Sequence, residues 1–403
     1  MTASPRAVCA SHLSTLPNAH EAVDEATGAI AAALGPRAPT LVAMFASTHH
    51  ARFLDRLPAL VADKLGCDRL IGCTGEGIIG TGREVEEEPA LSLWAAHLPR
   101  LAAHPFHLSF EPRVDLDKGV HGWPEPIDTG GRAPRVLVFL DPFSSVPQLV
   151  LDQFAKHYPG ATVSGGVASG GLRPGKNRLF LGREAMPAGA VGLLLHGPER
   201  FEATVSQGSK PIGRPFVVTK VQQNVVLELA GQSAFERFQQ MYATLAQGDQ
   251  KLARHSLHLG CVIDERKQTF ARGDFLLRNI HGIDPNTGAI MVSEPLRLGQ
   301  TVQFHVRDAA TASEDLALCV DEAVARARGD LAGALLFSCN GRGTRLFDKP
   351  DHDARVLSER AGNLPVAGFF AQGEIGPVGG RSYLHGFTAS LLLVYRSVED
   401  ESA

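Results

Sequence analysis

A strand–helix–strand unit that ends in a glycine-rich turn recurs along this chain and constrains its fold more than any other feature. The unit begins near Leu41, again near Arg135 and a third time near Gly333. In each copy a short apolar run is followed by a helical pattern, a second apolar run, a glycine loop and a closing strand. Such apolar runs are typical of strands buried on both faces. The repetition predicts similar units that pack together.

These repeats predict an α/β (mixed α+β) fold of two similar halves, with mixed sheets covered by helices. The chain has 403 residues, too many for one ordinary core, so we expect two domains. The run SQGSKPIGRP, between Phe201 and Gly213, resembles a linker. We therefore expect a helical segment over 1–38, one domain over 39–205 and another over 206–398. Residues 201–330 are interpreted as a degenerate fourth copy.

The composition of the chain excludes several classes of protein. The net charge is -4 and no long basic run is present, which argues against binding to nucleic acid. No apolar run reaches the roughly 18 residues of a membrane span, and no secretory signal opens the chain. The six cysteines include no C-x-x-C pair, as is typical of free thiols in a reducing compartment. We expect a cytoplasmic protein, and the Ala, Arg, Gly and Pro bias favours a bacterial source.

Two glycine-rich turns near the C-terminus carry polar residues that we expect to line one ligand site. The turns follow the runs GALLFS and VAGFFAQ, and their candidate ligand-binding residues are Cys339, Asn340, Gly341, Arg342, Gly373 and Glu374. Loops that leave the ends of buried strands are where α/β proteins place ligands. A carboxylate and a guanidinium held together would bind a zwitterion, of which an amino acid is the simplest. The alternative is an internal salt bridge between Arg342 and Glu374.

The glycine loop of the first copy, GEGIIG, also contains a carboxylate, Glu76. We interpret Glu76 and Glu374 as matching positions, either to bind an amine or to accept local backbone N–H groups. The loop matches the dinucleotide pattern G-x-G-x-x-G, but no helix opens after it and Glu76 would repel a pyrophosphate, so no nicotinamide is expected. The acidic run Glu84 to Glu88 that follows is expected to be exposed.

Cys339 is the candidate nucleophile if the protein is an enzyme. Its base would be Glu374 or His385, which must come from another strand. No G-x-S-x-G motif supports a serine triad, and no histidine pair has a metal-site spacing such as H-E-x-x-H. We therefore favour binding without a reaction, and we expect no metal.

Six blocks of the sequence resemble the successive blocks of FIST proteins, which pair an N-terminal and a C-terminal FIST domain. The blocks are LVAMFASTHH, LIGCTGEG, NVVLELAG, GALLFSCNGRG, VAGFFAQGEIGPV and LHGFTASLLL. The resemblance covers Ala38 to Tyr395 and is most specific in FSCNGRG and GFFAQGEIGP. It implies a sensory module of intracellular signalling that binds a small ligand, with amino acids or their derivatives as candidates. Some bacterial members are described as haem-containing nitric-oxide sensors, and a eukaryotic member carries an F-box and acts in ubiquitin ligation.

The resemblance also implies which residues are characteristic of the family. They fall on Cys339, Asn340, Gly341, Arg342, Gly343, Gly368, Gly373, Glu374 and Pro377. This chain departs from the family where H-N-x-T is replaced by His385-Gly386-Phe387-Thr388, and no output domain is attached. His385 is kept as a candidate ligand-binding residue.

We predict an intracellular sensor that binds a small polar ligand and signals through a separate partner protein. The alternatives are a Cys-dependent hydrolase or transferase and a haem-binding nitric-oxide sensor. No cofactor is expected unless the haem alternative holds. The sequence leaves the oligomeric state open.

Overall fold

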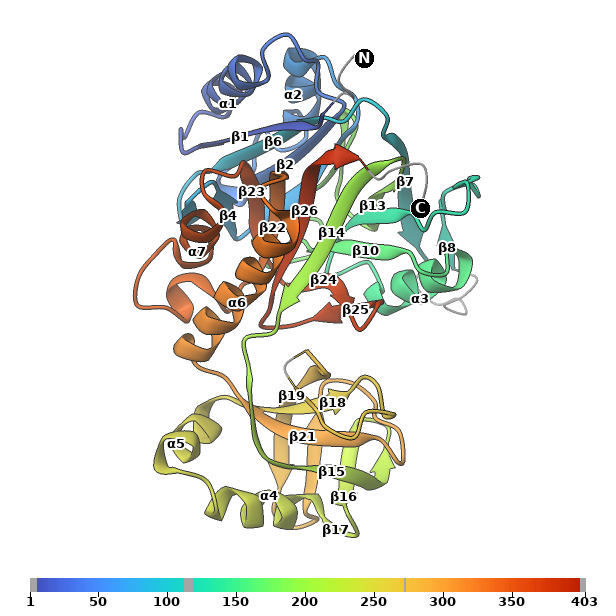
Figure 1. The fold of residues 1–403 in the computed structure, drawn as a ribbon, viewed down its shortest axis with the longest axis vertical. Helices are drawn as coiled ribbons and strands as arrows, with labels where there is room; N and C mark the ends of the chain where they lie inside the picture. Colours follow the sequence, from blue (N-terminus) through green and yellow to red (C-terminus); the bar gives the residue numbers. More distant parts are fainter. Residues whose placement is uncertain (1–5, 112–118, 272, 399–403) are drawn as a thin grey trace. The chain divides into compact units, whose positions relative to one another are not determined.

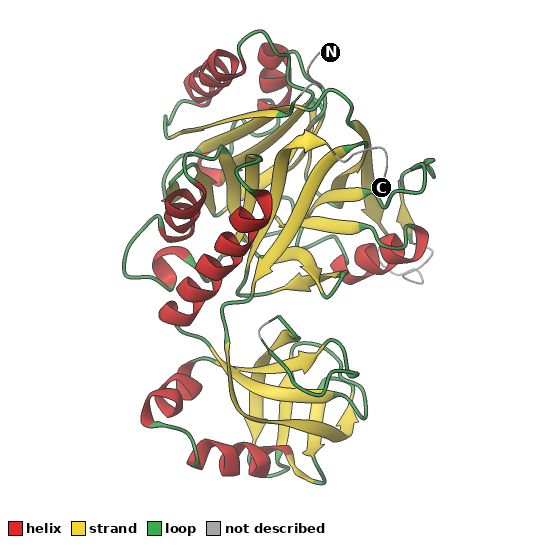
Figure 2. Cartoon of the chain, viewed as in Figure 1, coloured by secondary structure: helices red, strands yellow, loops and turns green. Residues whose placement is uncertain are grey.

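The computed structural model describes residues 6–111, 119–271 and 273–398 (Figure 1). The chain forms two compact units, one of residues 1–205 with 316–403 and one of Ser206–Asp315. Helices and strands mix in both units (Figure 2). The seven α-helices of the described residues are α1 (Ala19–Leu34), α2 (Leu57–Leu65), α3 (Pro147–His157), α4 (Ala234–Ala243), α5 (Gln247–His255), α6 (Ala309–Ala327) and α7 (His352–Ala361). No helix in this part of the chain is both long and apolar enough to cross a membrane.

Three sheets make up the first unit. In strand order the first sheet is β1 (Val8–Ser14), β6 (Leu91–His97), β2 (Leu41–Ser47), β3 (Leu70–Gly75), β11 (Leu179–Leu181) and β12 (Glu184–Met186). The second is β25 (Arg381–His385), β24 (Gly373–Val378), β10 (Thr162–Val167), β9 (Arg135–Leu140), β13 (Ala190–His196), β7 (Ala102–Phe110) and β8 (Val120–His121). The third is β14 (Glu199–Ser206), β26 (Ala389–Val398), β22 (Leu331–Cys339), β23 (Val366–Ala371), β4 (Gly77–Gly80) and β5 (Arg83–Glu86).

The three sheets share one plan, which comes from the repeat in the sequence. Each has a central parallel pair, β2 with β3, β9 with β10, or β22 with β23, and an antiparallel closing strand on one side. On the other side each sheet receives a hairpin from a different copy: β11–β12 joins β3, β24–β25 joins β10, and β4–β5 joins β23. The copies therefore exchange hairpins in a cycle, and each glycine turn carries the chain from one sheet to the next.

The inner faces of the three sheets meet in one apolar core that contains no helical residue. Phe45, Phe139 and Phe337 hold equivalent places in β2, β9 and β22, and their ring centroids lie 5.4 to 6.2 Å apart. Phe369 contacts all three rings, at 5.2 to 5.8 Å. Its counterpart in the second copy is Gly166, where an added Cβ would lie 3.3 Å from the Phe369 ring. One large side chain thus fills the centre that the three copies share.

The outer faces are covered by helices, as Figure 2 shows. Residues of α1 and α2 pack on the first sheet, α3 packs on the second, and α6 and α7 supply residues to the core on the third. Along β2 the residues alternate between the inner core and the helix-covered face, although all are buried. The predicted mixed sheets, built from repeated units and covered by helices, are confirmed.

The second unit has a different plan. Its sheet runs β15 (Lys210–Gln222), β21 (Thr301–Val306), β18 (Leu257–Val262), β19 (Phe275–Asp284), β20 (Ala289–Val292), β16 (Val225–Leu229) and β17 (Gln232–Ser233). The additional pairing of β15 with β16 closes six of these strands into a barrel-like sheet, and every strand pairing among the described residues of this unit is antiparallel. The segment is therefore not a fourth copy of the repeat, which requires a parallel pair.

The copies are distributed differently from the expected two similar halves. All three lie in the first unit, because the strands of Leu316–Ala403 pair with hairpins and strands of the N-terminal half. The break after Val205 lies where the linker-like run begins. Within 1–38 the structure has the expected helix, α1, and Asn18 caps it by accepting the N–H groups of His20 and Glu21. It adds a strand, β1, whose mixed polar and apolar residues gave no clear strand signal.

Candidate functional site

The strand register shows which residues of the three copies correspond. Glu374 pairs with Gly166, Ile78 with Phe369 and Leu179 with Cys73. These partners are themselves equivalent, because they lie opposite Phe139, Phe337 and Phe45 in the three parallel pairs. Glu374 therefore corresponds to Ile78 and Leu179. The interpretation that it matches Glu76 is wrong by two positions, since glycine spacing in the sequence did not fix the register.

Glu374 is a fully buried carboxylate at a position that is apolar in the other two copies. Its Oε2 accepts hydrogen bonds from the N–H of Thr388, at 3.0 Å, and from its hydroxyl, at 2.8 Å. The corresponding N–H groups of the other copies, those of Ala90 and Gly189, bond to serine hydroxyls at 2.9 and 2.8 Å. Glu374 thus meets a structural requirement that all three copies share, the satisfaction of a buried backbone donor before the closing strand.

The other residues expected around Glu374 also make internal contacts. His385 lies opposite Glu374 in the β24–β25 hairpin, and its Nε2 is 3.0 Å from the carbonyl oxygen of Gly376. Cys339 is buried, its N–H bonds to the carbonyl of Thr388 at 3.0 Å, and the N–H of Gly341 lies 3.5 Å from its sulfur. Thr388 therefore links the ends of β22 and β24. Gly373 packs on the side chain of Leu384, 3.0 Å from where a Cβ would stand.

Arg342 does not pair with Glu374. Its guanidinium is fully buried and binds Asp353 through two contacts, Nε to Oδ2 at 2.6 Å and Nη2 to Oδ1 at 2.7 Å. Asp353 also accepts the Ser338 hydroxyl at 2.8 Å and lies 2.8 Å from Nδ1 of His352. Burial would raise the pKa of Asp353, but Arg342 and His352 hold it below the usual value. The sequence showed Asp353 only as an acidic residue in the first turn of a helix.

Glu84 belongs to the same buried cluster, contrary to the expected exposure of the acidic run. It lies in β5, is 6% exposed, and accepts the N–H of Ala354 at 2.9 Å in the first turn of α7. Burial and the Asp353 carboxylate raise its pKa from 4.5 to about 8. The hairpin of the first copy thus brings a carboxyl group to the helix of the third.

We expect Glu84→Gln to flatten the dependence of stability on pH. The folded state binds the Glu84 proton more tightly than the unfolded chain does, with a pKa near 8 against 4.5. Its contribution to stability is therefore complete below about pH 4.5 and falls by up to about 1.4 kcal/mol per pH unit as the pH rises towards 8. The uncharged amide keeps an acceptor for Ala354. Urea unfolding at several pH values measures this, with exposed Glu88→Gln as the control. Parallel pH profiles for wild type and Glu84→Gln would contradict the assignment.

A small hollow lies where the loops after β3 and β22 meet, at the carboxyl ends of two parallel pairs. We call it the Asn340 hollow; its volume is about 40 Å³, and it is lined by Glu76, Gly77, Glu86, Glu87, Asn340, Thr344, Arg345 and Phe370. Among the described residues the buried Oδ1 of Asn340 has no hydrogen-bond partner. Glu76 pairs with Arg345, and Glu86 accepts the N–H and hydroxyl of Thr344 at 2.9 and 3.0 Å. Of the predicted site residues, Asn340 is the one that faces a hollow.

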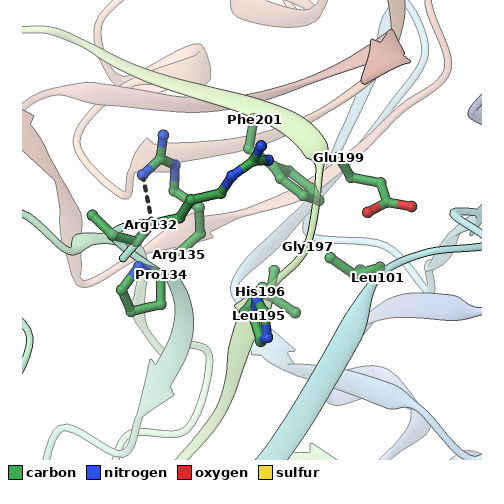
Figure 3. A pocket seen from close by; sticks show the side chains of 10 residues that line it. Leu101, Arg132, Pro134, Arg135, Leu195, His196, Gly197, Glu199 and Phe201 are labelled. Carbon is green, nitrogen blue, oxygen red and sulfur yellow. Dashed lines mark hydrogen bonds between the residues drawn. The ribbon is translucent and has the colours of Figure 1, made fainter. Parts of the chain in front are cut away.

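A second small hollow lies at the N-terminal end of β9. We call it the Glu199 hollow; Figure 3 shows Arg132, Arg135, His196 and Glu199 around it, and its volume is about 30 Å³. Glu199 is 6% exposed and accepts the N–H of Arg100 at 2.7 Å, while its Oε2 and the Nδ1 of His196 have no partner among the described residues. Its volume is about that of two waters, and its lining carries charges of both signs.

Within residues 6–111, 119–271 and 273–398, no group of three or more His, Cys, Asp or Glu side chains is arranged to hold a metal ion. The hydrogen bond between Nε2 of His385 and the Gly376 carbonyl puts the proton on Nε2, so the alternative in which His385 is the base for Cys339 would use Nδ1.

Comparison with known proteins identifies the family. The sequence matches the FIST N domain over residues 40–232 and the FIST C domain over residues 234–377. The chain belongs to the FIST family. FIST domains are generally a signal-transduction sensory family, as the resemblance of the sequence blocks implied. The FIST N match extends past Val205, into the second compact unit.

Relatives of about the same length as this chain occur in mycobacteria. An uncharacterized protein of Mycobacterium tuberculosis is 40% identical over 386 residues, which cover 94% of this chain and 98% of the relative. One of Mycobacterium bovis is 40% identical over 391 residues, which cover 96% and 98%. Among solved structures, a cyanuric acid hydrolase from A. caulinodans aligns over 98% of this chain and 100% of its own, with 11% identity and a TM-score of 0.29.

Proposed function

We propose that this FIST protein is a sensor that binds a small ligand by its ammonium group at the Asn340 hollow and passes the signal to a separate protein. The buried Oδ1 of Asn340, which lacks a partner among the described residues, carries the proposal. A buried acceptor of this kind costs free energy until a donor reaches it. Its place at the carboxyl ends of parallel strands is where α/β folds bind ligands.

The charges around the hollow favour an amine. Glu76, Glu86 and Glu87 supply three carboxylates against the single guanidinium of Arg345. An ammonium group is about the size of a water molecule and has three hydrogen-bond donors. It therefore fits a hollow of about 40 Å³ while the rest of the ligand stays outside. Arg345 is half exposed and could hold a carboxylate of the same ligand. An amino acid or a derivative meets both requirements.

The position of the hollow also supports a signalling role. Glu76 and Glu86 come from the first copy, whereas Asn340 and Thr344 come from the third. Glu87 has a φ of 61°, in the left-handed region that a non-glycine residue adopts at a cost. A ligand that bridges the two segments would shift the population of their conformations, which is what a partner protein would read.

Calorimetric titration with the common amino acids and simple primary amines tests the proposal. Asn340→Leu and Glu76→Gln should each weaken binding of the amine that binds wild type by about ten- to a hundredfold, the loss of one charge-assisted hydrogen bond. Glu88→Gln is the control, because this neighbouring exposed carboxylate does not line the hollow. Unchanged affinity in both site variants, or no binding of any amine to wild type, would reject the proposal.

A further inference from the structure

A much larger cavity lies elsewhere in the first unit, between α3 and the segment that precedes β9. Its volume is about 720 Å³, within the range of roughly 300–1,000 Å³ that small-molecule sites occupy. About half of its lining residues are aromatic residues or prolines, including Trp123, Pro126, Phe154, Tyr158 and Pro159. None of the predicted site residues lies there. The cavity is therefore separate from the Asn340 hollow.

The aromatic wall of this cavity is held in place by its own contacts. Trp123 meets Phe154 edge to face, with ring centroids 5.7 Å apart, and Phe154 stacks on Tyr158 at 6.4 Å. Phe154 is 1% exposed and anchors the group in the core of the second sheet. The N–H of Ile127 bonds to the Tyr158 hydroxyl at 3.4 Å, which ties the facing segment to the helix. Such a preformed aromatic wall suits a flat ring system.

A cationic side chain stands at one side of the cavity. Arg132 lines both the cavity and the Glu199 hollow, where Arg135 is a second guanidinium (Figure 3). A guanidinium binds carboxylate and sulfonate groups through two parallel hydrogen bonds. The carboxylate in the cavity lining, that of Glu125, belongs to an exposed residue. Arg132 therefore supplies a guanidinium to the cavity lining.

We propose that this cavity is a second ligand site and that it takes a small, flat aromatic acid. The ring system would lie against Trp123 and Tyr158, which Phe154 supports from the core, and the acid group would lie at Arg132. This inference does not depend on the amine site, because the two sites share no lining residue.

Two fluorescent probes that differ in one group test the assignment. Anilinonaphthalene sulfonate is an aromatic acid, and phenylnaphthylamine has the same rings without the sulfonate. We expect wild-type protein to bind one equivalent of the sulfonate with energy transfer from tryptophan. Arg132→Gln should weaken sulfonate binding by about tenfold and leave phenylnaphthylamine binding within about twofold. Arg173→Gln removes the same charge from an exposed site outside the cavity and should change neither probe.

The position of the probe is tested separately. The chain has two tryptophans; Trp123 lines the cavity, whereas Trp94 is buried in the central core. Trp123→Phe should lower the energy transfer clearly while the directly excited probe still binds. Tyr158→Ala should weaken both probes. Equal loss of both probes in Arg132→Gln would overturn the acid preference. Energy transfer that is unchanged in Trp123→Phe, or sulfonate binding with no defined stoichiometry, would overturn the site.

Discussion

Replacing Arg342 with methionine is expected to destabilise the first unit by about 3–5 kcal/mol, because the change leaves the buried Asp353 carboxylate without its guanidinium partner. Arg342 and Asp353 are both fully buried and are joined by two short hydrogen bonds. Loss of the guanidinium would also raise the pKa of Asp353, since burial would no longer be opposed by that charge. Urea unfolding followed by tryptophan fluorescence measures the effect, because both tryptophans lie in the first unit.

A matched surface pair is the control for the Arg342 prediction. Arg360 pairs with Asp321 where both side chains are at least 40% exposed, so Arg360→Met should cost less than about 1 kcal/mol. A second variant, Arg342→Met with Asp353→Leu, removes both charges and should recover much of the lost stability. A small effect of Arg342→Met alone would mean that the carboxylate finds another partner and that the pair does not hold the loop to α7.

Gly368→Ala is expected to destabilise the same unit by at least about 3 kcal/mol, through steric overlap in the centre of the third sheet. An added Cβ would stand 1.7 Å from the carbonyl oxygen of Leu336 on the adjacent parallel strand. Gly72 and Gly165 hold the equivalent positions, with Cβ distances of 1.7 and 1.9 Å to the carbonyls of their neighbours. All three central pairs thus require glycine for the close approach of their backbones, and the strands cannot separate without disturbing the core.

Gly28→Ala serves as the control for this second prediction. Gly28 lies inside α1, and no atom from another segment of the protein lies within 4 Å of the place that an alanine methyl group would take. Alanine should therefore be neutral or stabilising there, by up to about 1 kcal/mol. The same denaturation experiment compares the two substitutions. A Gly368→Ala protein as stable as wild type would show that the parallel pair tolerates a side chain and that the glycine is not a packing requirement.

The sequence alone predicted features that depend on neighbours along the chain. The apolar runs of β2, β9 and β22 and the amphipathic helices that follow them come from local periodicity. The three copies of the repeat and the FIST blocks were equally visible, because both are patterns in residue order, whereas the fourth copy expected in 201–330 was wrong. The prediction that Asn340 is a site residue was reached in the same way, since it follows the end of a buried strand.

Tertiary structure decided everything that depends on which strands pair. Exchange of hairpins between copies makes Glu374 the structural equivalent of Ile78. The same exchange brings Glu84 into contact with a helix some 270 residues later in the chain. The partner of Arg342 proved to be Asp353, which lies on a helix after an intervening loop. The cavity at Trp123 depends on how an irregular segment packs against α3. Local sequence patterns determine whether each segment forms a helix or a strand. Which strands and side chains then contact one another depends on the free energy of the whole core, which cannot be read from any single stretch of sequence.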